Sequence, residues 1–162
     1  MLPTIQIKDN FLTNKEFKIL FNNIDKFNYV PEISNDGDPY GFAHNFNENL
    51  ENQWFFKKIK KQFFPNTNLK PGKCVYNLRH NCKKILSHKD IYDDYNFILY
   101  LKGKELVYNG TGFYYKNNLN TYLGFVKNRA LFFDGKNNTH TDLQALGESS
   151  PRYTINIFYN NG

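Results

Sequence analysis

The sequence has few cysteines, no long apolar run and no basic N-terminal segment, and each of these absences argues against a class of protein. Its two cysteines, Cys74 and Cys82, are eight positions apart and form no Cys-x-x-Cys pair. Free thiols are therefore expected, rather than a disulfide or a thiolate metal site. No apolar stretch reaches the roughly 20 residues that span a bilayer, and residues 1–5 lack the features of a signal peptide. We therefore expect a soluble cytoplasmic protein with no membrane partner.

Aromatic residues and lysines, by contrast, are abundant. Of the 162 residues, 18% are aromatic and 40% are hydrophobic, which predicts one globular domain over residues 1–162. The formal net charge of +6 is compatible with an anionic substrate or a nucleic acid, but the lysines are scattered along the whole chain. Charge that is dispersed in this way is better explained by its effect on solubility. The net charge alone therefore does not indicate a binding partner.

The first part of the chain, residues 1–70, is predicted to be a helical support with a loop. A short strand is expected at Ile5–Lys8. The capping-box pattern Thr13–Glu16 then begins a helix with an apolar face. A loop rich in proline and glycine follows at Tyr29–Asn47, and a second helix is expected at Asn49–Gln62.

From Lys73 onward the apolar pattern alternates with a period of two, which indicates strands. Turn residues separate the segments, and no helical pattern lies between them. Such an arrangement is typical of a double-stranded β-helix, also called a jelly roll, with the two helices packed on the outside of one sheet. We therefore predict a mainly β fold with N-terminal helices (α+β) and a jelly-roll core over residues 71–162. The predicted strands are Cys74–Arg79, Ile85–Ile91, Tyr95–Lys102, Glu105–Tyr108, Gly112–Lys116, Tyr122–Val126, Ala130–Asp134, Thr139–Leu143 and Tyr153–Tyr159.

Two histidines and an aspartate form a candidate metal site. His88 and Asp90 are two residues apart, so in a strand both side chains would point to the same face. His140 is 52 residues further along, a distance that several intervening strands can fold back into one pocket. Two imidazoles and one carboxylate are the ligand set that leaves three positions open on non-haem Fe(II). The alternative for His140 is a surface histidine in the polar stretch around it.

An arginine near the C-terminus is a candidate anion clamp. Arg152 precedes the alternating strand Tyr153–Tyr159 and shares a face with Thr154. An inward-facing arginine beside an inward-facing hydroxyl is costly unless both bind something, and a dicarboxylate would satisfy them. The alternative is an arginine at the end of a strand that reaches solvent.

In this order, the four residues His88, Asp90, His140 and Arg152 resemble a known family. The sequence is similar to the Fe(II)/2-oxoglutarate-dependent dioxygenases, especially the compact group that resembles prolyl 4-hydroxylases. The resemblance covers Cys74 to Tyr159. Within it, Tyr95–Leu101 is similar to the family's strand after the metal triplet, and Asn128–Phe133 is similar to the strand before the distal histidine.

This resemblance implies a cofactor set and a role for each residue. Fe(II) would be held by His88, Asp90 and His140, and 2-oxoglutarate would chelate the metal. The far carboxylate of 2-oxoglutarate would pair with Arg152 and Thr154, and Tyr76 is a further candidate for binding it. Dioxygen would be consumed with release of succinate and CO₂, and ascorbate would act as a supporting reductant. The carboxylate of Asp90 favours hydroxylation over halogenation, because related halogenases have a small residue at that position.

The substrate is less well defined by the sequence. Nucleic-acid demethylases of the superfamily carry a second arginine six residues after the first, and that position is Phe158 here. We therefore expect a peptidyl or small-molecule substrate rather than a nucleic acid. The Pro31–Asn47 loop and the aromatic segment Phe113–Tyr115 are candidates for a lid and a pocket wall. The competing hypothesis is a jelly-roll binding module without turnover, and the sequence indicates no oligomeric state.

Overall fold

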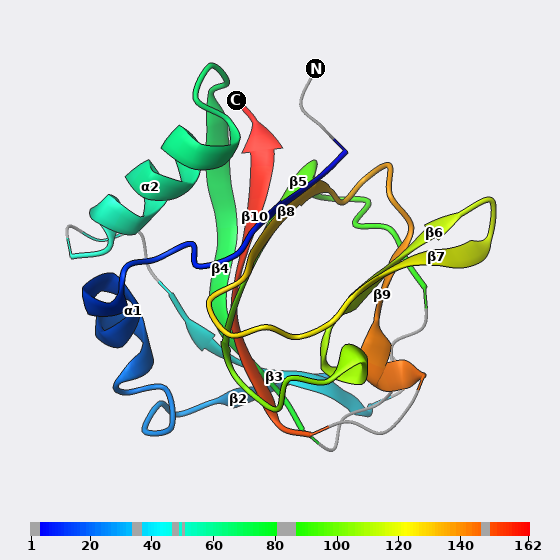
Figure 1. Cartoon of the computed structure of the whole chain (residues 1–162), viewed down its shortest axis with the longest axis horizontal. Coiled ribbons are helices and arrows are strands. Elements are labelled where there is room, and N and C mark those ends of the chain that lie inside the picture. The colour runs from blue at the N-terminus through cyan, green and yellow to red at the C-terminus, as the bar shows by residue number, and fades with distance from the viewer. Residues whose placement is uncertain (1–3, 34–36, 47–48, 50, 81–86, 147–149) are drawn as a thin grey trace.

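The computed structural model of the protein describes residues 4–33, 37–46, 49, 51–80, 87–146 and 150–162. These residues form a mainly β structure with two α-helices and two short 3₁₀-helices (Figure 1). The elements are, in chain order, β1 (Ile5–Lys8), α1 (Asn14–Phe21), β2 (Val30–Ile33), β3 (Pro39–Asn45), α2 (Gln53–Phe63), β4 (Leu69–Arg79), β5 (Tyr95–Lys102), η1 (Val107–Asn109), β6 (Thr111–Tyr115), β7 (Asn118–Leu123), β8 (Ala130–Asp134), β9 (His140–Asp142), η2 (Leu143–Ala145) and β10 (Arg152–Asn161).

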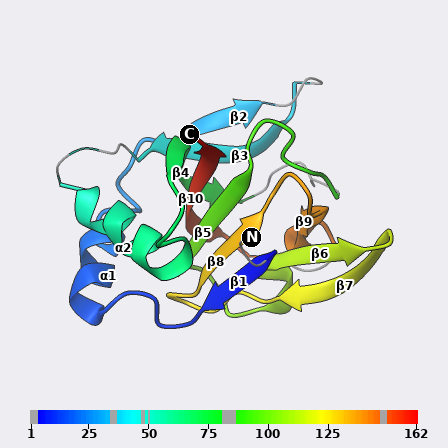
Figure 2. The same ribbon diagram turned by 90° about the horizontal axis from the view of Figure 1, so that it is seen from above.

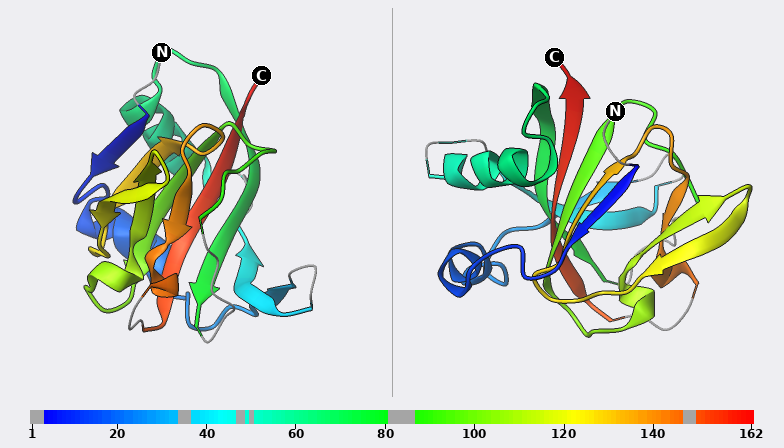
Figure 3. Two further views of the ribbon diagram at one scale, coloured as in Figure 1. Left: turned by 90° about the vertical axis from the view of Figure 1, so that its right-hand side faces the viewer. Right: turned by 45° about the horizontal axis from the view of Figure 1, so that its top comes forward.

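Two antiparallel sheets face one another. The larger has seven strands in the order β1-β8-β5-β10-β4-β3-β2, and the smaller has the order β7-β6-β9. Seen from above, the smaller sheet lies across from β8 and β5, while both helices lie on the opposite side of the large sheet (Figure 2). The two further views in Figure 3 show the same arrangement. This is the predicted jelly roll with helices outside one sheet.

Strand β10, in the middle of the large sheet, has side chains on both faces of that sheet. Its residues Ile155, Ile157 and Tyr159 are buried in the cluster under the helices. The alternate residues Arg152 and Thr154 point the other way, toward the small sheet, because successive strand side chains face opposite sides. The alternation of the sequence therefore correctly predicted which residues of this strand face the interior of the barrel.

Aromatic rings fill both sides of the large sheet. On the helix side, Phe55 and Phe63 of α2 pack against Phe97 of β5, with ring centroids 5.7 and 5.9 Å apart. Between the sheets, a second cluster consists of Tyr100, Phe113, Phe125, Leu131 and Phe133. Burial of such rings is the main stabilising contribution to a fold of this size.

Several predicted elements are confirmed. Strands at Ile5–Lys8, Tyr95–Lys102 and Ala130–Asp134 have the expected bounds, and the capping box precedes α1 with both of its hydrogen bonds. The second helix begins later than expected, at Gln53, and ends at Phe63. None of the helices in the described part of the chain is long and apolar enough to cross a membrane.

Other predictions are wrong, and tertiary pairing is the reason. The expected loop Tyr29–Asn47 contains strands β2 and β3, which extend the large sheet beside β4. The first 70 residues thus contain strands β1, β2 and β3 of this sheet in addition to the two helices. Pro31 is tolerated because β2 is the edge strand of the sheet, and Pro39 because it is the first residue of β3. The expected strand Glu105–Tyr108 is replaced by the 3₁₀-helix η1.

Candidate metal centre

The three predicted metal ligands converge. His88, Asp90 and His140 each offer one ligand atom, and these atoms all lie within 4.8 Å of one another. The His140 Nε2 atom is 3.2 Å from Asp90 Oδ2, and His88 Nε2 is 3.8 Å from Asp90 Oδ1. Two imidazoles and a carboxylate around one point form the facial ligand set of a non-haem iron site. The donor chemistry therefore fits Fe(II).

The backbone brings the two histidines together. His88 and His140 form an isolated antiparallel bridge, with N···O distances of 2.8 and 2.9 Å. The predicted strand Ile85–Ile91 is not what aligns the ligands: residues 81–86 lie outside the described residues, and in residues 87–91 only this bridge at His88 is formed. A single bridge to β9, rather than a strand of its own, thus positions His88.

Hydrogen bonds orient the ligands. His140 Nδ1 lies 3.0 Å from the carbonyl oxygen of Asn138, and because a carbonyl can only accept, Nδ1 carries the proton. The Nε2 atom, which faces Asp90, is therefore the His140 nitrogen that would bind a metal ion. On the other ligand, the Asn96 amide donates to Asp90 Oδ2, and the Asp90 backbone N–H donates to the Gly135 carbonyl at 3.0 Å.

Asp90 is held in its charged form. Burial alone would raise the pKa of this carboxyl, but the hydrogen bond and charge of His140, helped by His88 and Asn96, hold it below its ordinary value. A carboxylate that stays ionised is the form that binds a metal ion.

Arg152 lies at the other side of the same cavity. The cavity has a volume of about 90 Å³ and connects the metal ligands with the start of β10. Its lining comprises Arg79, His88, Asp90, Asn96, Ile98, Thr111, His140, Thr141, Asp142, Arg152, Asn156 and Phe158. Arg152 is thus a buried side chain with 6% exposure and does not reach solvent, which was the alternative left open by the sequence.

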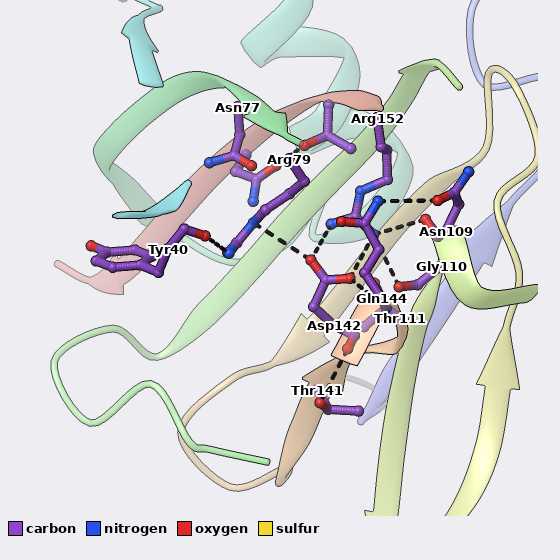
Figure 4. A network of polar contacts seen from close by, with 12 residues as sticks. Tyr40, Asn77, Arg79, Asn109, Gly110, Thr111, Thr141, Asp142, Gln144 and Arg152 are labelled. Carbon is purple, nitrogen blue, oxygen red and sulfur yellow. Dashed lines mark hydrogen bonds and ion pairs between the residues drawn. The ribbon is translucent and has the colours of Figure 1, made fainter. Parts of the chain in front are cut away.

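The Arg152 guanidinium already has several partners (Figure 4). Its Nη1 donates to the carbonyls of Asn109 and Gly110, at 2.7 and 3.0 Å. Asp142 accepts two bonds from it, at 3.1 Å from Nη1 and 2.7 Å from Nη2. The Nε atom is buried and has no hydrogen-bond partner among the described residues. Because an unsatisfied buried donor is costly, this edge of the guanidinium fits a ligand carboxylate.

The two remaining predicted residues differ in their placement. Thr154 is buried on the same face as Arg152, and its hydroxyl donates to Asn156 Oδ1 at 2.6 Å. Tyr76 faces the helical side of the sheet, where its ring packs against Phe27 and Phe46 at 4.8 and 5.2 Å. Burial there raises the pKa of its hydroxyl to about 12. The expectation that Tyr76 binds the co-substrate is therefore corrected: the alternation of β4 points it away from the cavity.

The structure adds polar residues that the sequence did not single out. Asp142 is two positions after His140 in β9, and Arg79 lies directly opposite Arg152 in the β4–β10 register. Tyr100 and Thr111 share a hydrogen bond of 2.8 Å beneath them. The strand periodicity carried a signal for Asp142, because it shares a face with His140, but the position of Arg79 depended on the sheet register.

The fold is similar to those of solved prolyl hydroxylases and 2-oxoglutarate/Fe(II) oxygenases. Among solved structures, the chain is similar to a prolyl hydroxylase from Trichoplax adhaerens in complex with a peptide of the hypoxia inducible factor oxygen degradation domain. The TM-score is 0.70 at 12% identity, covering 98% of this chain and 84% of that one. It is also similar to a viral collagen prolyl hydroxylase from Paramecium Bursaria Chlorella virus-1 with 2-oxoglutarate, with a TM-score of 0.62 at 16% identity over 99% and 97% of the two chains.

A third similar structure is HygX from Streptomyces hygroscopicus with nickel and 2-oxoglutarate bound. Its TM-score is 0.66 at 9% identity, covering 98% of this chain and 83% of that chain. No protein-family model matches the sequence, and a search of curated proteins finds no match. At these identities the likeness is one of fold, and function must be argued from the site itself.

Proposed function

We propose that this protein is an Fe(II)- and 2-oxoglutarate-dependent oxygenase that hydroxylates a peptidyl or small-molecule substrate. The observation that carries the proposal is the meeting of His88, Asp90 and His140 within 4.8 Å in a cavity that also contains Arg152. Similar folds include prolyl hydroxylases and a protein with nickel and 2-oxoglutarate bound, which supports this choice of chemistry.

Each part of the site has a defined task in this reaction. The three ligands would hold Fe(II) and leave three positions open, and Arg152 would bind the far carboxylate of 2-oxoglutarate through its Nε and Nη2 donors. When bound, the iron supplies the oxidation in which 2-oxoglutarate, dioxygen and a substrate C–H group become succinate, CO₂ and a C–OH group. The buried position of Arg152 strengthens its attraction for a carboxylate, because water is excluded.

The residues around the cavity favour a peptidyl or small-molecule substrate. Phe158, six positions after Arg152, lines the cavity with an apolar ring. Ile91 and Tyr92 directly follow Asp90 and are 66% and 87% exposed, so an apolar or aromatic contact surface begins beside the metal site. We also infer a cytoplasmic location, because the reducing conditions of the cytoplasm suit an Fe(II) enzyme.

The test is succinate formation from 2-oxoglutarate with Fe(II) and ascorbate, using wild type, His140→Ala and Arg152→Leu. Wild type should release succinate, and His140→Ala should release none because one of three ligands is lost. Arg152→Leu should raise the KM for 2-oxoglutarate while its affinity for Mn(II), measured by calorimetry, stays unchanged. If wild type neither binds 2-oxoglutarate nor releases succinate, the jelly-roll binding module is the correct description instead.

A further inference from the structure

Two arginines face each other across neighbouring strands inside the barrel. Arg79 and Arg152 are direct partners in the β4–β10 register, and both line the cavity. Like charges directly opposite one another in a sheet are destabilising unless an anion lies between them. The side chains of Arg79 and Arg152 are only 16% and 7% exposed, so water cannot relieve this repulsion fully.

Asp142 is the anion between the two arginines (Figure 4). Its Oδ2 atom lies 2.7 Å from Arg152 Nη2 and 3.5 Å from Arg79 Nε, so one carboxylate oxygen serves both guanidinium groups. Arg79 is further anchored by a hydrogen bond from its Nη1 to the Tyr40 carbonyl. The side chain of Asp142 is only 11% exposed. The three side chains therefore form one buried cluster, which we call the Arg–Asp–Arg cluster.

The charge of this cluster is positive by one unit. Taken by themselves, the two arginines and the one aspartate have a formal charge of plus one, which matches one incoming carboxylate. Glu32, whose carboxylate lies beside Gly41 as the Arg79 guanidinium does, forms an ion pair with Lys73. If Arg79 were absent, the Arg152–Asp142 pair would be neutral, and an incoming carboxylate would be buried beside Asp142 without a compensating charge. Burying an uncompensated charge is strongly unfavourable.

We propose that Arg79 is a positioning residue for the 2-oxoglutarate site: by pairing with Asp142, it leaves Arg152 with a net positive charge for the far carboxylate. This inference rests on the proposed function, since it concerns the same co-substrate. Arg152 makes the contact, through its buried Nε donor. Arg79 acts through Asp142 and sets the selectivity of the site for a dicarboxylate over a monocarboxylate 2-oxo acid.

The test is calorimetric binding to the Mn(II)-loaded protein, with two probes. One probe is 2-oxoglutarate; the other is 2-oxobutanoate, which keeps the metal-chelating end but lacks the far carboxylate. Arg79→Gln should weaken 2-oxoglutarate binding by about tenfold or more, because it leaves the incoming carboxylate uncompensated. The same variant should leave the affinity for 2-oxobutanoate within about twofold of wild type, taking twofold as a small free-energy change.

A second substitution separates charge from structure. In the double variant Arg79→Gln/Asp142→Asn the cluster again carries one positive charge, that of Arg152, so 2-oxoglutarate affinity should return to within about threefold of wild type. Arg79→Lys also preserves the charge and should bind nearly as well as wild type, which keeps the test decisive even if Arg79→Gln folds poorly. If Arg79→Lys weakens binding as much as Arg79→Gln, or if the double variant is not rescued, the charge role is wrong.

The two proposals can fail separately. If wild type binds 2-oxoglutarate and Arg79→Gln binds it equally well, the role of Arg79 is refuted while the proposed function stands. If wild type binds neither 2-oxoglutarate nor 2-oxobutanoate, the proposed function fails and this inference fails with it.

Discussion

Replacing Asn96 should weaken metal binding although Asn96 is not itself a metal ligand. Its side-chain amide donates to Asp90 Oδ2, the oxygen that also faces His140. Asn96 is 6% exposed, so water cannot readily take the place of its amide in Asn96→Ala. The Asp90 carboxylate would then lose the hydrogen bond that fixes its orientation. Binding of the metal ion would have to order this carboxylate, which lowers the affinity.

The magnitude follows from the chemistry of this bond. A hydrogen bond to a charged group contributes about 1.5–3 kcal/mol net. Losing a residue that orients a metal ligand typically reduces metal affinity about 10–100-fold, which corresponds to about 1.4–2.8 kcal/mol. The two ranges agree, so we expect Asn96→Ala to raise the Kd for Mn(II) by about 10–100-fold.

The assay is calorimetric titration of the metal-free protein with Mn(II), with Asn77→Ala as a matched control. Asn77 is as deeply buried as Asn96, at 4% exposure, and its amide also donates to a carboxylate, that of Glu32 at 3.3 Å. Urea unfolding of both variants would report any general loss of stability. The reasoning is refuted if Asn96→Ala binds Mn(II) within about twofold of wild type, or if Asn77→Ala weakens binding equally.

Three further predictions concern the metal site and helix α1. In Gly135→Ala the new Cβ would lie 2.8 Å from Asp90 Oδ2 and 3.1 Å from Asn96 Nδ2, so the carboxylate must shift; calorimetry should give an Mn(II) affinity about tenfold weaker. Thr13→Ala removes the N-cap bond to the Glu16 N–H, and urea unfolding should give a free energy of unfolding about 1 kcal/mol lower. Burial would raise the pKa of Glu16, but bonds from Lys58 and Thr13 hold it below its ordinary value of 4.5. The contribution of the Glu16 carboxylate to the free energy of unfolding is therefore fully present above pH 4.5. It is lost as the pH falls through the lowered pKa. Glu16→Gln should accordingly be less stable than wild type in urea at pH 7, and the two should converge at strongly acidic pH; a constant difference would contradict this.

Local sequence patterns were enough to predict much of this fold. The alternation along β5, β8 and β10 reports burial on the two sides of one sheet, and the capping box of α1 depends only on residues three apart. Strands β2 and β3 could not be predicted in this way, because their proline- and glycine-containing residues form strands only through pairing next to β4. Similarly, η1 replaces a predicted strand because local propensity is a weak guide without its tertiary context.

Some features of the candidate site likewise depend on local sequence, and others depend on the tertiary structure. The sequence by itself determined the types of the metal ligands and the inward face that Arg152 shares with Thr154, because residue chemistry and strand periodicity are local properties. Only the tertiary structure decided that His88 is aligned by a bridge to His140, that Tyr76 faces the helices, and that Arg79 lies opposite Arg152 with Asp142 between them. Sheet register sets these distances between residues far apart in the chain, and a change of one residue in register would turn each side chain to the other face.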